Sequence, residues 1–597
     1  MGMGNIGRIA LALHVLFASF VLWVVPVHAL FLADLVVFPV SLLVALRDLA
    51  GRWPLAAPED RRRRVQERQR QRQQDAAAST ALREAGTDVQ RRRTAGADKP
   101  AEADRPAEPA RQGARSRAPL GRIALLAVQV ALFAMVLDSV YRPLVAPAED
   151  VLVFRAGYVS HDTARMHIRY PGPGPLELRY RPLAGAGGGG GGNVPWESAG
   201  ALAAPTGATD FTVTAALANL QPATRYAVEL HSRQPTLHAA TVRLASAEFR
   251  TAPPPGTPTR LRFGTGSCIK PNFPYRPTRT PDVYGFASML EHSAGLDMVM
   301  FMGDFIYADV PLYFGPEPAA YRRLYRNVYA APSARRLMRR VPMLYVYDDH
   351  EIKNNWHRQD QPPMGSALAA FDEYNGRPNP PPAAPGVAYY NFTHGNVAFY
   401  AWDTRRYRTR WESAGGGGGG SSGGPEPTAT MLGAEQKRHF ARWLRDVNHT
   451  AAVKFVVSSV PVTTGWANRD SAQDTWRGYP TERAEILALT RHVPNLFFLS
   501  GDRHEMAAVV LPSGNIEFST SPVSQFTFPL VGSFRPDRDG ERTLHFRRPG
   551  HVKYGILDVD TATDPAVPRV TYSLYTTDVH RGRRPAWVYE AKGAPWR

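Results

Sequence analysis

The chain contains a single cysteine, Cys268, among its 597 residues. It therefore forms no internal disulfide, which usually indicates a protein of a reducing compartment. If the segment around Cys268 faced an oxidising compartment instead, its thiol would be prone to oxidation. Coordination of the thiolate by a metal ion would protect it.

Acidic residues are scarce relative to basic ones, with 53 Asp and Glu against 71 Lys and Arg and a net charge of +18. Much of this excess lies between Arg47 and Arg122, and no nucleic-acid-binding motif accompanies it, so we expect no nucleic-acid partner. Residues 51–119 also contain hardly any aromatic side chain. They cannot bury a core, which predicts a basic, disordered loop.

Two apolar stretches flank this basic segment. Residues 6–46 are long enough for two crossings of roughly 20 residues each, which predicts two transmembrane helices within 1–50. A signal peptide followed by an apolar stretch is the alternative. The second stretch, Ile123–Val140, predicts a transmembrane helix over 120–142, or else a buried helix of a soluble domain.

The basic residues orient the predicted helices. Under the positive-inside rule the Arg-rich loop stays cytoplasmic, the first two helices form a hairpin, and the third carries everything after Tyr141 across the bilayer. Sequons at Asn391 and Asn448 agree with this orientation. The chain is therefore predicted to be an integral membrane protein, embedded in a lipid bilayer, with its main part extracellular or luminal.

Short alternating apolar segments fill residues 147–253 and predict an all-β domain. The segment Leu220–Tyr226, which reads LQPATRY, resembles the tyrosine corner of fibronectin type III domains, where the phenol hydroxyl ties back to the backbone. This predicts an immunoglobulin or fibronectin III-like sandwich in which Tyr226 is structural.

Beyond residue 260, apolar strands alternate with helical segments, which predicts an α/β domain over 260–597. Polar side chains follow four of these strands, and ligands gather at the carboxyl ends of strands in such sheets. A thiol with carboxylates and histidines suggests a metal site that mixes soft and hard ligands. The candidates, in order of strand, are Cys268; Asp304 and Tyr307; Asp348, Asp349 and His350; Asp502 and His504.

The ordered motifs GSC, GDFIY, DDHE with NN behind it, and GDRH resemble the PhoD-like alkaline phosphatases of the metallophosphoesterase superfamily. The resemblance implies an α/β/β/α sandwich, with two sheets flanked by helices. It also implies iron(III) held by Cys268, Asp304 and Tyr307, with calcium at neighbouring carboxylates. The sequence alone leaves zinc, manganese and other divalent metals open.

The resemblance and the chemistry together assign roles. Asp304 is expected to bridge two metal ions and so to be catalytic as well as a ligand, and His350 to protonate the leaving oxygen. Glu351, Asn354 and Asn355 are expected to contact phosphate or to support the metal ligands, with a pair on the surface of a helix as the alternative. Other readings stay open: a packing aromatic for Tyr307, a buried apolar thiol for Cys268, and a core histidine for His350. The remaining predicted ligands are Asp348, Asp349, Asp502 and His504.

The sequence thus predicts a membrane-anchored phosphatase that hydrolyses phosphomonoesters, phosphodiesters or both with a metal-activated hydroxide. One alternative within this class is a phospholipase D-like phosphodiesterase acting on membrane lipids. An alternative from another class is a catalytically inert, membrane-tethered adhesion or receptor module.

Overall fold

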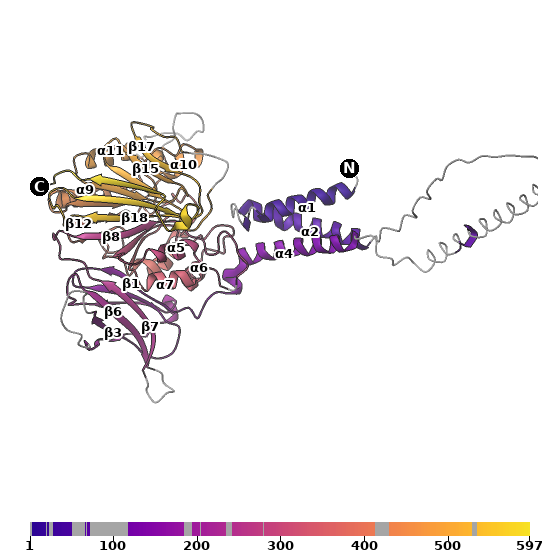
Figure 1. The fold of residues 1–597 in the computed structure, drawn as a ribbon, viewed down its shortest axis with the longest axis horizontal. Coiled ribbons are helices and arrows are strands. Elements are labelled where there is room, and N and C mark those ends of the chain that lie inside the picture. Colours follow the sequence, from indigo (N-terminus) through magenta and orange to yellow (C-terminus); the bar gives the residue numbers. More distant parts are fainter. Residues whose placement is uncertain are drawn as a thin grey trace, which may run out of the picture. The chain divides into compact units, whose positions relative to one another are not determined.

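The structure is a computed structural model (Figure 1). It describes residues 3–19, 21–22, 28–50, 66, 69–71, 118–183, 194–202, 204–233, 241–278, 280–411, 429–527 and 534–596. The chain forms two compact units, Met1–Leu16 with Ala33–Phe133, and Phe17–Leu32 with Ala134–Arg597. The predicted disordered loop, 51–119, lies almost entirely outside the described residues.

Three apolar helices begin the described chain: α1 (Met3–Ser19), α2 (His28–Ala50) and α4 (Ala118–Val145). Among the helices described, the stretch Ile123–Val145 of α4 is long and apolar enough to cross a membrane, with a mean hydropathy of 2.3. The apolar stretches Ile9–Ser19 and Leu32–Leu46 are shorter. The predicted span at 120–142 therefore has a suitable helix, and the two spans within 1–50 stay a prediction.

A β-sandwich follows, made of a three-stranded sheet in the order β1-β2-β5 and a four-stranded sheet in the order β4-β3-β6-β7, all antiparallel. The Tyr226 hydroxyl accepts a 2.8 Å hydrogen bond from the backbone N–H of Gln221, which is the tie that a tyrosine corner makes. The fibronectin III class of this sandwich stays a prediction. Its strands are β1 (Val153–Val159), β2 (Ala164–Arg169), β3 (Leu176–Pro182), β4 (Glu197–Leu202), β5 (Thr212–Leu217), β6 (Arg225–Arg233) and β7 (Thr241–Arg250).

Arg155 of β1 fixes this sandwich to the domain that follows. Its guanidinium is buried and donates to the Tyr329 hydroxyl at 3.1 Å and to the carbonyl oxygens of Met343 at 3.1 Å and Tyr374 at 2.9 Å. A buried guanidinium needs such acceptors, because an unpaired charge there would be costly. The sandwich is therefore packed tightly on the second domain.

The second domain has a six-stranded sheet in the order β10-β9-β8-β18-β19-β20 and a seven-stranded sheet in the order β11-β12-β13-β14-β16-β15-β17. Strands β8, β9 and β10 run parallel, as do β12, β13, β14 and β16. The bounds are β8 (Arg260–Gly266), β9 (Met298–Met302), β10 (Met343–Val346), β11 (Tyr390–His394), β12 (Val397–Ala401), β13 (Val453–Val457), β14 (Leu496–Ser500), β15 (Met506–Val510), β16 (Ile516–Thr520), β17 (Arg542–Arg547), β18 (Lys553–Asp560), β19 (Arg569–Thr576) and β20 (Trp587–Lys592).

The two sheets pack face to face through an apolar layer in which the Phe263 ring lies 5.4 Å from that of Phe399 and 5.2 Å from that of Phe455. Helices α5 (Tyr284–Glu291), α6 (Pro318–Ala330), α7 (Pro332–Met338) and α8 (Met364–Phe371) cover the six-stranded sheet. Helices α9 (Gly433–Asn448) and α11 (Pro480–Thr490) cover the other sheet. The predicted mixed α/β fold is confirmed, and its layers run helix, sheet, sheet, helix.

The loops that follow β8, β9 and β14 meet at one edge of the paired sheets. Cys268 N–H donates to the Gly303 carbonyl at 3.1 Å, and Asp502 N–H donates to the Ser267 hydroxyl at 3.1 Å. Because these hydrogen bonds tie the three loops together, side chains from distant parts of the sequence reach the same place.

Candidate active site

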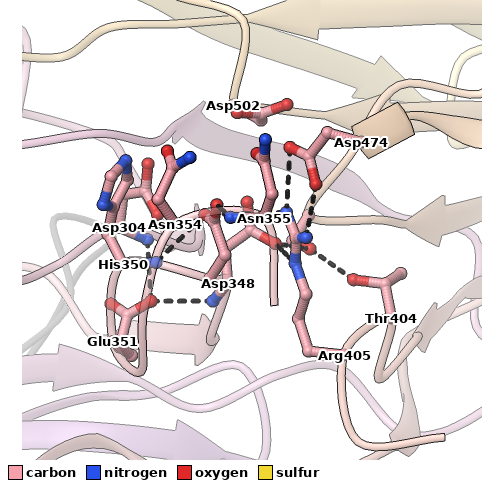
Figure 2. Close-up of polar contacts among 12 residues, drawn as sticks. Asp304, Asp348, His350, Glu351, Asn354, Asn355, Thr404, Arg405, Asp474 and Asp502 are labelled. Atoms are coloured by element: carbon pink, nitrogen blue, oxygen red, sulfur yellow. Dashed lines mark hydrogen bonds and ion pairs between the residues drawn. The ribbon is translucent and has the colours of Figure 1, made fainter. Parts of the chain in front are cut away.

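Asp304 follows β9 by two residues and lies beside His350 in the candidate site (Figure 2). Its Oδ2 is 3.3 Å from Cys268 Sγ and accepts a 3.1 Å hydrogen bond from the Tyr307 hydroxyl, which also lies 2.8 Å from His504 Nε2. Potential ligand atoms of Cys268, Asp304 and His504 all lie within 4.8 Å of one another. One corner of the site thus combines a thiol, a carboxylate, a phenol and an imidazole.

A second corner consists of carboxylates. Ligand atoms of Asp304, Asp348, Asp349 and Asp502 lie within 4.8 Å of one another, and Asp304 and Asp349 form a similar group with His350. Asp304 belongs to all three groups. Among the residues that the structure describes, it is the one side chain that the thiol corner and the carboxylate corner share.

The backbone at four of these positions is in the left-handed region: φ is 64° at Cys268, 57° at Asp304, 71° at Asp502 and 55° at His504. Such a conformation costs a residue with a Cβ about 1–2 kcal/mol, and strained residues of this kind cluster at functional sites. Gly303 precedes Asp304 with φ of 95°, and a Cβ there would lie 2.5 Å from the Asp348 Cβ. Only glycine fits where the two strand ends approach.

Glu351 holds together the loops that follow β9 and β10. Its carboxylate accepts backbone N–H groups from Asp304 at 3.0 Å, Phe305 at 2.5 Å and Asp348 at 2.7 Å, and thus joins the ends of β9 and β10. Burial raises the pKa of Glu351 to about 8, although these N–H donors favour its ionised form. The side chain faces the backbone rather than the ligand atoms.

His350 lies against the phenol ring of Tyr307, with the ring centroids 4.2 Å apart. Its Nδ1 is 2.7 Å from Asp309 Oδ1. Burial by itself lowers the pKa of His350, but the carboxylates of Asp309, Asp349 and Asp304 outweigh it and raise this pKa well above its usual value. The geometry therefore favours a protonated imidazole held through Nδ1.

Arg405 is a residue of the site that the sequence motifs did not indicate. Its guanidinium is fully buried, with Nε 2.5 Å from Asp348 Oδ1, Nη1 2.6 Å from Asp474 Oδ1 and Nη2 3.6 Å from Asp349 Oδ1 (Figure 2). The sequence did contain a signal, because Arg405 follows the apolar strand β12 and Asp403 just as the other candidates follow theirs. Asp474 precedes a short 3₁₀ turn and has no comparable signal.

Two carboxylate oxygens of the site are buried and have no hydrogen-bond partner in the described structure, Asp304 Oδ1 and Asp348 Oδ2. Burial and the neighbouring carboxylates raise the pKa of Asp304 well above its usual value, and burial raises that of Asp348 to about 6. Burial, followed by the charge of Asp304, also raises the thiol pKa of Cys268. A cluster of buried acids that repel one another and have unfilled lone pairs fits bound cations.

A cavity of about 370 Å³ opens onto this cluster. Within it, the side-chain amide of Asn355 donates to Asp470 Oδ1 at 2.8 Å, while the backbone N–H of Asn354 donates to Asp309 Oδ2 at 2.7 Å. Arg503 reaches Asp502 at 3.2 Å and Asp470 at 2.8 Å. Phe526 adds an aromatic edge against the His504 ring, 4.5 Å between centroids. The predicted substrate contacts of Asn354 and Asn355 stay predictions.

Two packed mixed sheets with acids, histidines and a thiol at their strand ends give the chain a fold of the metallophosphoesterase kind. A sequence model of PhoD-like phosphatases matches residues 267–566, just over half of the 597 residues. The chain therefore belongs to the PhoD-like phosphatase family, as the motifs predicted.

A curated relative, alkaline phosphatase D of Bacillus subtilis (strain 168), is 25% identical over 323 residues, which are 48% of this chain and 52% of the relative. The chain thus spans about half the length of that relative. A solved structure of PhoD aligns with a TM-score of 0.52 and 17% identity over 73% of this chain and 91% of that chain. Purple acid phosphatase PPD1 from yellow lupin seeds aligns with a TM-score of 0.53 and 13% identity over 74% of both chains. These two structures support the fold.

Proposed function

We propose that the chain is a metal-dependent hydrolase of phosphate esters, acting on monoesters, diesters or both. The observation that carries the proposal is Asp304, which is shared by three groups of potential ligands and keeps one buried carboxylate oxygen without a hydrogen-bond partner among the described residues. The family and the alkaline phosphatase D relative support the reaction class.

We assign Cys268, Asp304, Tyr307 and His504 to one metal ion, and Asp304, Asp348, Asp349 and Asp502 to its neighbour. Thiolate and phenolate donors suit iron(III), and the carboxylates suit calcium or another divalent ion. Bound ions of this kind neutralise charge on the phosphoryl group and provide hydroxide at ordinary pH. The chain itself holds, orients and protonates the ester.

His350 is the proposed proton donor to the leaving oxygen. Because Asp309 occupies Nδ1, Nε2 is the ring nitrogen left to deliver a proton. Arg503, Asn354 and Asn355 line the cavity, so we propose that they orient the phosphoryl oxygens. The cavity size is within the range of small-molecule sites.

The decisive experiment is Asp304→Asn in the full chain, with metal content and turnover of p-nitrophenyl phosphate measured together. Both ions lose a charged ligand, so turnover should fall by at least about a thousandfold, along with bound metal. Asp309→Asn is the matched control, because Asp309 contacts Nδ1 of His350 but belongs to none of the three groups of potential ligands, and this variant should retain its metal. Near-normal turnover of a metal-replete Asp304→Asn protein would refute the proposal.

We further propose that α4 anchors the enzyme in a membrane with the catalytic domain on the extracellular or luminal side, and that the preceding sandwich is of the fibronectin III type. The Arg residues ahead of α4 support this orientation, and the Tyr226 tie supports the sandwich class.

A phospholipase D-like activity is the second candidate. It is favoured by the end of α4, where the Tyr275 hydroxyl donates to Asp138 at 2.8 Å and so joins the helix to the loop that begins at Cys268. Comparing a soluble diester with a phospholipid in micelles distinguishes the two activities. A metal-replete protein inactive on every ester would favour the inert receptor module instead.

A further inference from the structure

The N-terminal helices bury two ionisable side chains against each other. His14 on α1 and Asp34 on α2 are both 0% exposed, and His14 Nδ1 lies 2.7 Å from Asp34 Oδ1. The third helix takes part as well, because His14 Nε2 lies 3.1 Å from the backbone carbonyl oxygen of Gln129 on α4. Three segments that are far apart in the sequence thus meet at one imidazole ring. Their helices α1, α2 and α4 lie side by side (Figure 1).

The acceptors around this ring determine where its hydrogens lie. A backbone carbonyl can only accept, so Nε2 must carry a hydrogen. Opposite Nδ1 there are then two arrangements, an imidazolium donating to a carboxylate, or a neutral imidazole accepting from a protonated Asp34. Both keep one proton between Nδ1 and Oδ1, and both have a net charge of zero.

Loss of that proton would be costly here. It would leave a net negative charge and two facing lone pairs in a fully buried position. Among the side chains described in α1, α2 and α4 up to Phe133, His14 and Asp34 are the only ionisable ones. Two aromatic rings lie near the imidazole, with the ring centroids of Phe38 at 5.0 Å and Phe133 at 6.3 Å from that of His14. The other carboxylate oxygen, Asp34 Oδ2, is buried without a hydrogen-bond partner in this part of the structure.

We propose that His14 and Asp34 form a proton-binding site in the core of the N-terminal helix bundle, and that the shared proton holds α1, α2 and α4 together. Anchoring alone does not require this arrangement, because hydroxyl or amide side chains join helices without an ionisable group. Ionisable residues inside apolar helix bundles typically mark a function. The inference rests on contacts within the bundle and is independent of the phosphatase chemistry.

Hydrogen exchange of the full-length protein in detergent micelles, resolved by mass spectrometry, tests the proposal. After correction for the intrinsic pH dependence of exchange, peptides from α1 and α2 should lose protection together as the pH rises and the shared proton leaves. Loss of one interhelical hydrogen bond of this kind should make the amides of these peptides exchange about threefold to twentyfold faster.

Asp34→Asn is the decisive variant. Its amide can donate to Nδ1 and preserve the contact but cannot release a proton, so protection should be retained and become independent of pH. His14→Ala should lose protection at every pH. Gln129→Ala is the matched control for the pH dependence. It keeps the main-chain carbonyl contact with His14 but removes the 3.4 Å hydrogen bond from the Ser41 hydroxyl to the Gln129 side chain, so protection should fall at every pH while its pH dependence stays that of the wild type.

Wild-type protection that does not change with pH would overturn the proposal, as would the same pH dependence in Asp34→Asn. Protection in His14→Ala equal to that of the wild type would show that the pair does not join the helices. Asp304→Asn should leave the exchange profile of α1 and α2 unchanged, so failure of the phosphatase proposal and failure of this one give different results.

Discussion

Replacing Arg405 by glutamine tests whether a buried guanidinium holds the carboxylate corner in place. The side chain is 0% exposed and lies between Asp348, Asp474 and Asp349. With Asp348 Oδ1 fixed by Arg405 and by the Ser459 hydroxyl, at 2.5 Å each, the remaining oxygen Oδ2 is left for a metal ion. The substitution should therefore affect both folding stability and metal binding.

The expected loss of unfolding free energy depends on which ion pairs remain after Arg405 is replaced. Removing one partner of a buried ion pair costs about 3–5 kcal/mol of unfolding free energy. Asp474 would keep Arg408 at 3.1 Å and Arg503 at 3.8 Å, so the uncompensated charge falls mainly on Asp348. We expect a loss of about 3 kcal/mol for Arg405→Gln, at the lower end of that range.

Chemical denaturation measures this loss, and metal analysis with turnover measures its consequence at the site. Arg406→Gln is the matched control, because Arg406 pairs with Asp360, which is 67% exposed, and surface pairs contribute at most about 1 kcal/mol. A double variant, Arg405→Met with Asp348→Asn, should recover part of the stability without recovering metal affinity, because the carboxylate that Arg405 compensates is then no longer charged. A loss below about 1 kcal/mol in Arg405→Gln with normal metal content would refute the reasoning.

Two further predictions concern the chemistry of the site. Thiolate and phenolate donate charge to iron(III), so the purified protein should be coloured, with a visible absorption band that shifts or disappears in Cys268→Ser and Tyr307→Phe. A colourless, fully active enzyme without iron would contradict the iron assignment. His350→Gln should keep its metal and lose turnover most on esters with poor leaving groups, because these depend most on protonation. An equal loss on esters with good and poor leaving groups would argue against the general-acid role.

The sequence was sufficient for the α/β fold and for many residues of the site because each signal was local. Apolar runs followed by Asp, His or Cys predicted strand ends, and strand ends in parallel sheets share an edge. The same reasoning predicted the hydroxyl tie of Tyr226. What local patterns do not contain is pairing across the chain: nothing near Arg405 in the sequence shows that it faces Asp474, 69 residues later.

The roles of neighbouring residues were equally hard to separate from the sequence. Glu351 lies within the same motif as Asp348 and His350, yet it accepts backbone N–H groups and so serves the fold. Asp309, outside every motif, holds His350. Such differences depend on the direction in which a side chain points after a left-handed turn, as at Asp304, and the sequence does not specify it.

The last prediction concerns how the stability of the protein depends on pH once its metal ions have been removed. In the metal-free chain, burial raises the pKa of Asp348 from 3.8 to about 6, and Asp304 and Asp502 shift in the same direction. A carboxyl group whose pKa is higher in the folded state binds more protons there than in the unfolded chain. Metal-free stability must therefore fall as the pH rises from about 4 through 6, by about 3 kcal/mol for Asp348 alone.

Bound cations remove this penalty, because they compensate the ionised carboxylates. The difference in melting temperature between metal-loaded and metal-free protein should thus widen as the pH rises from 4 to 7. The metal-free sample is prepared by treatment with a chelator at neutral pH and is then exchanged into a buffer of each pH. In Asp348→Asn, the difference in melting temperature should widen less between pH 4 and 7 than it does in the wild type. A constant difference across this pH range would mean that the carboxylate cluster does not bind the cations, and the assignment of the second ion to Asp348 and its neighbours would fail.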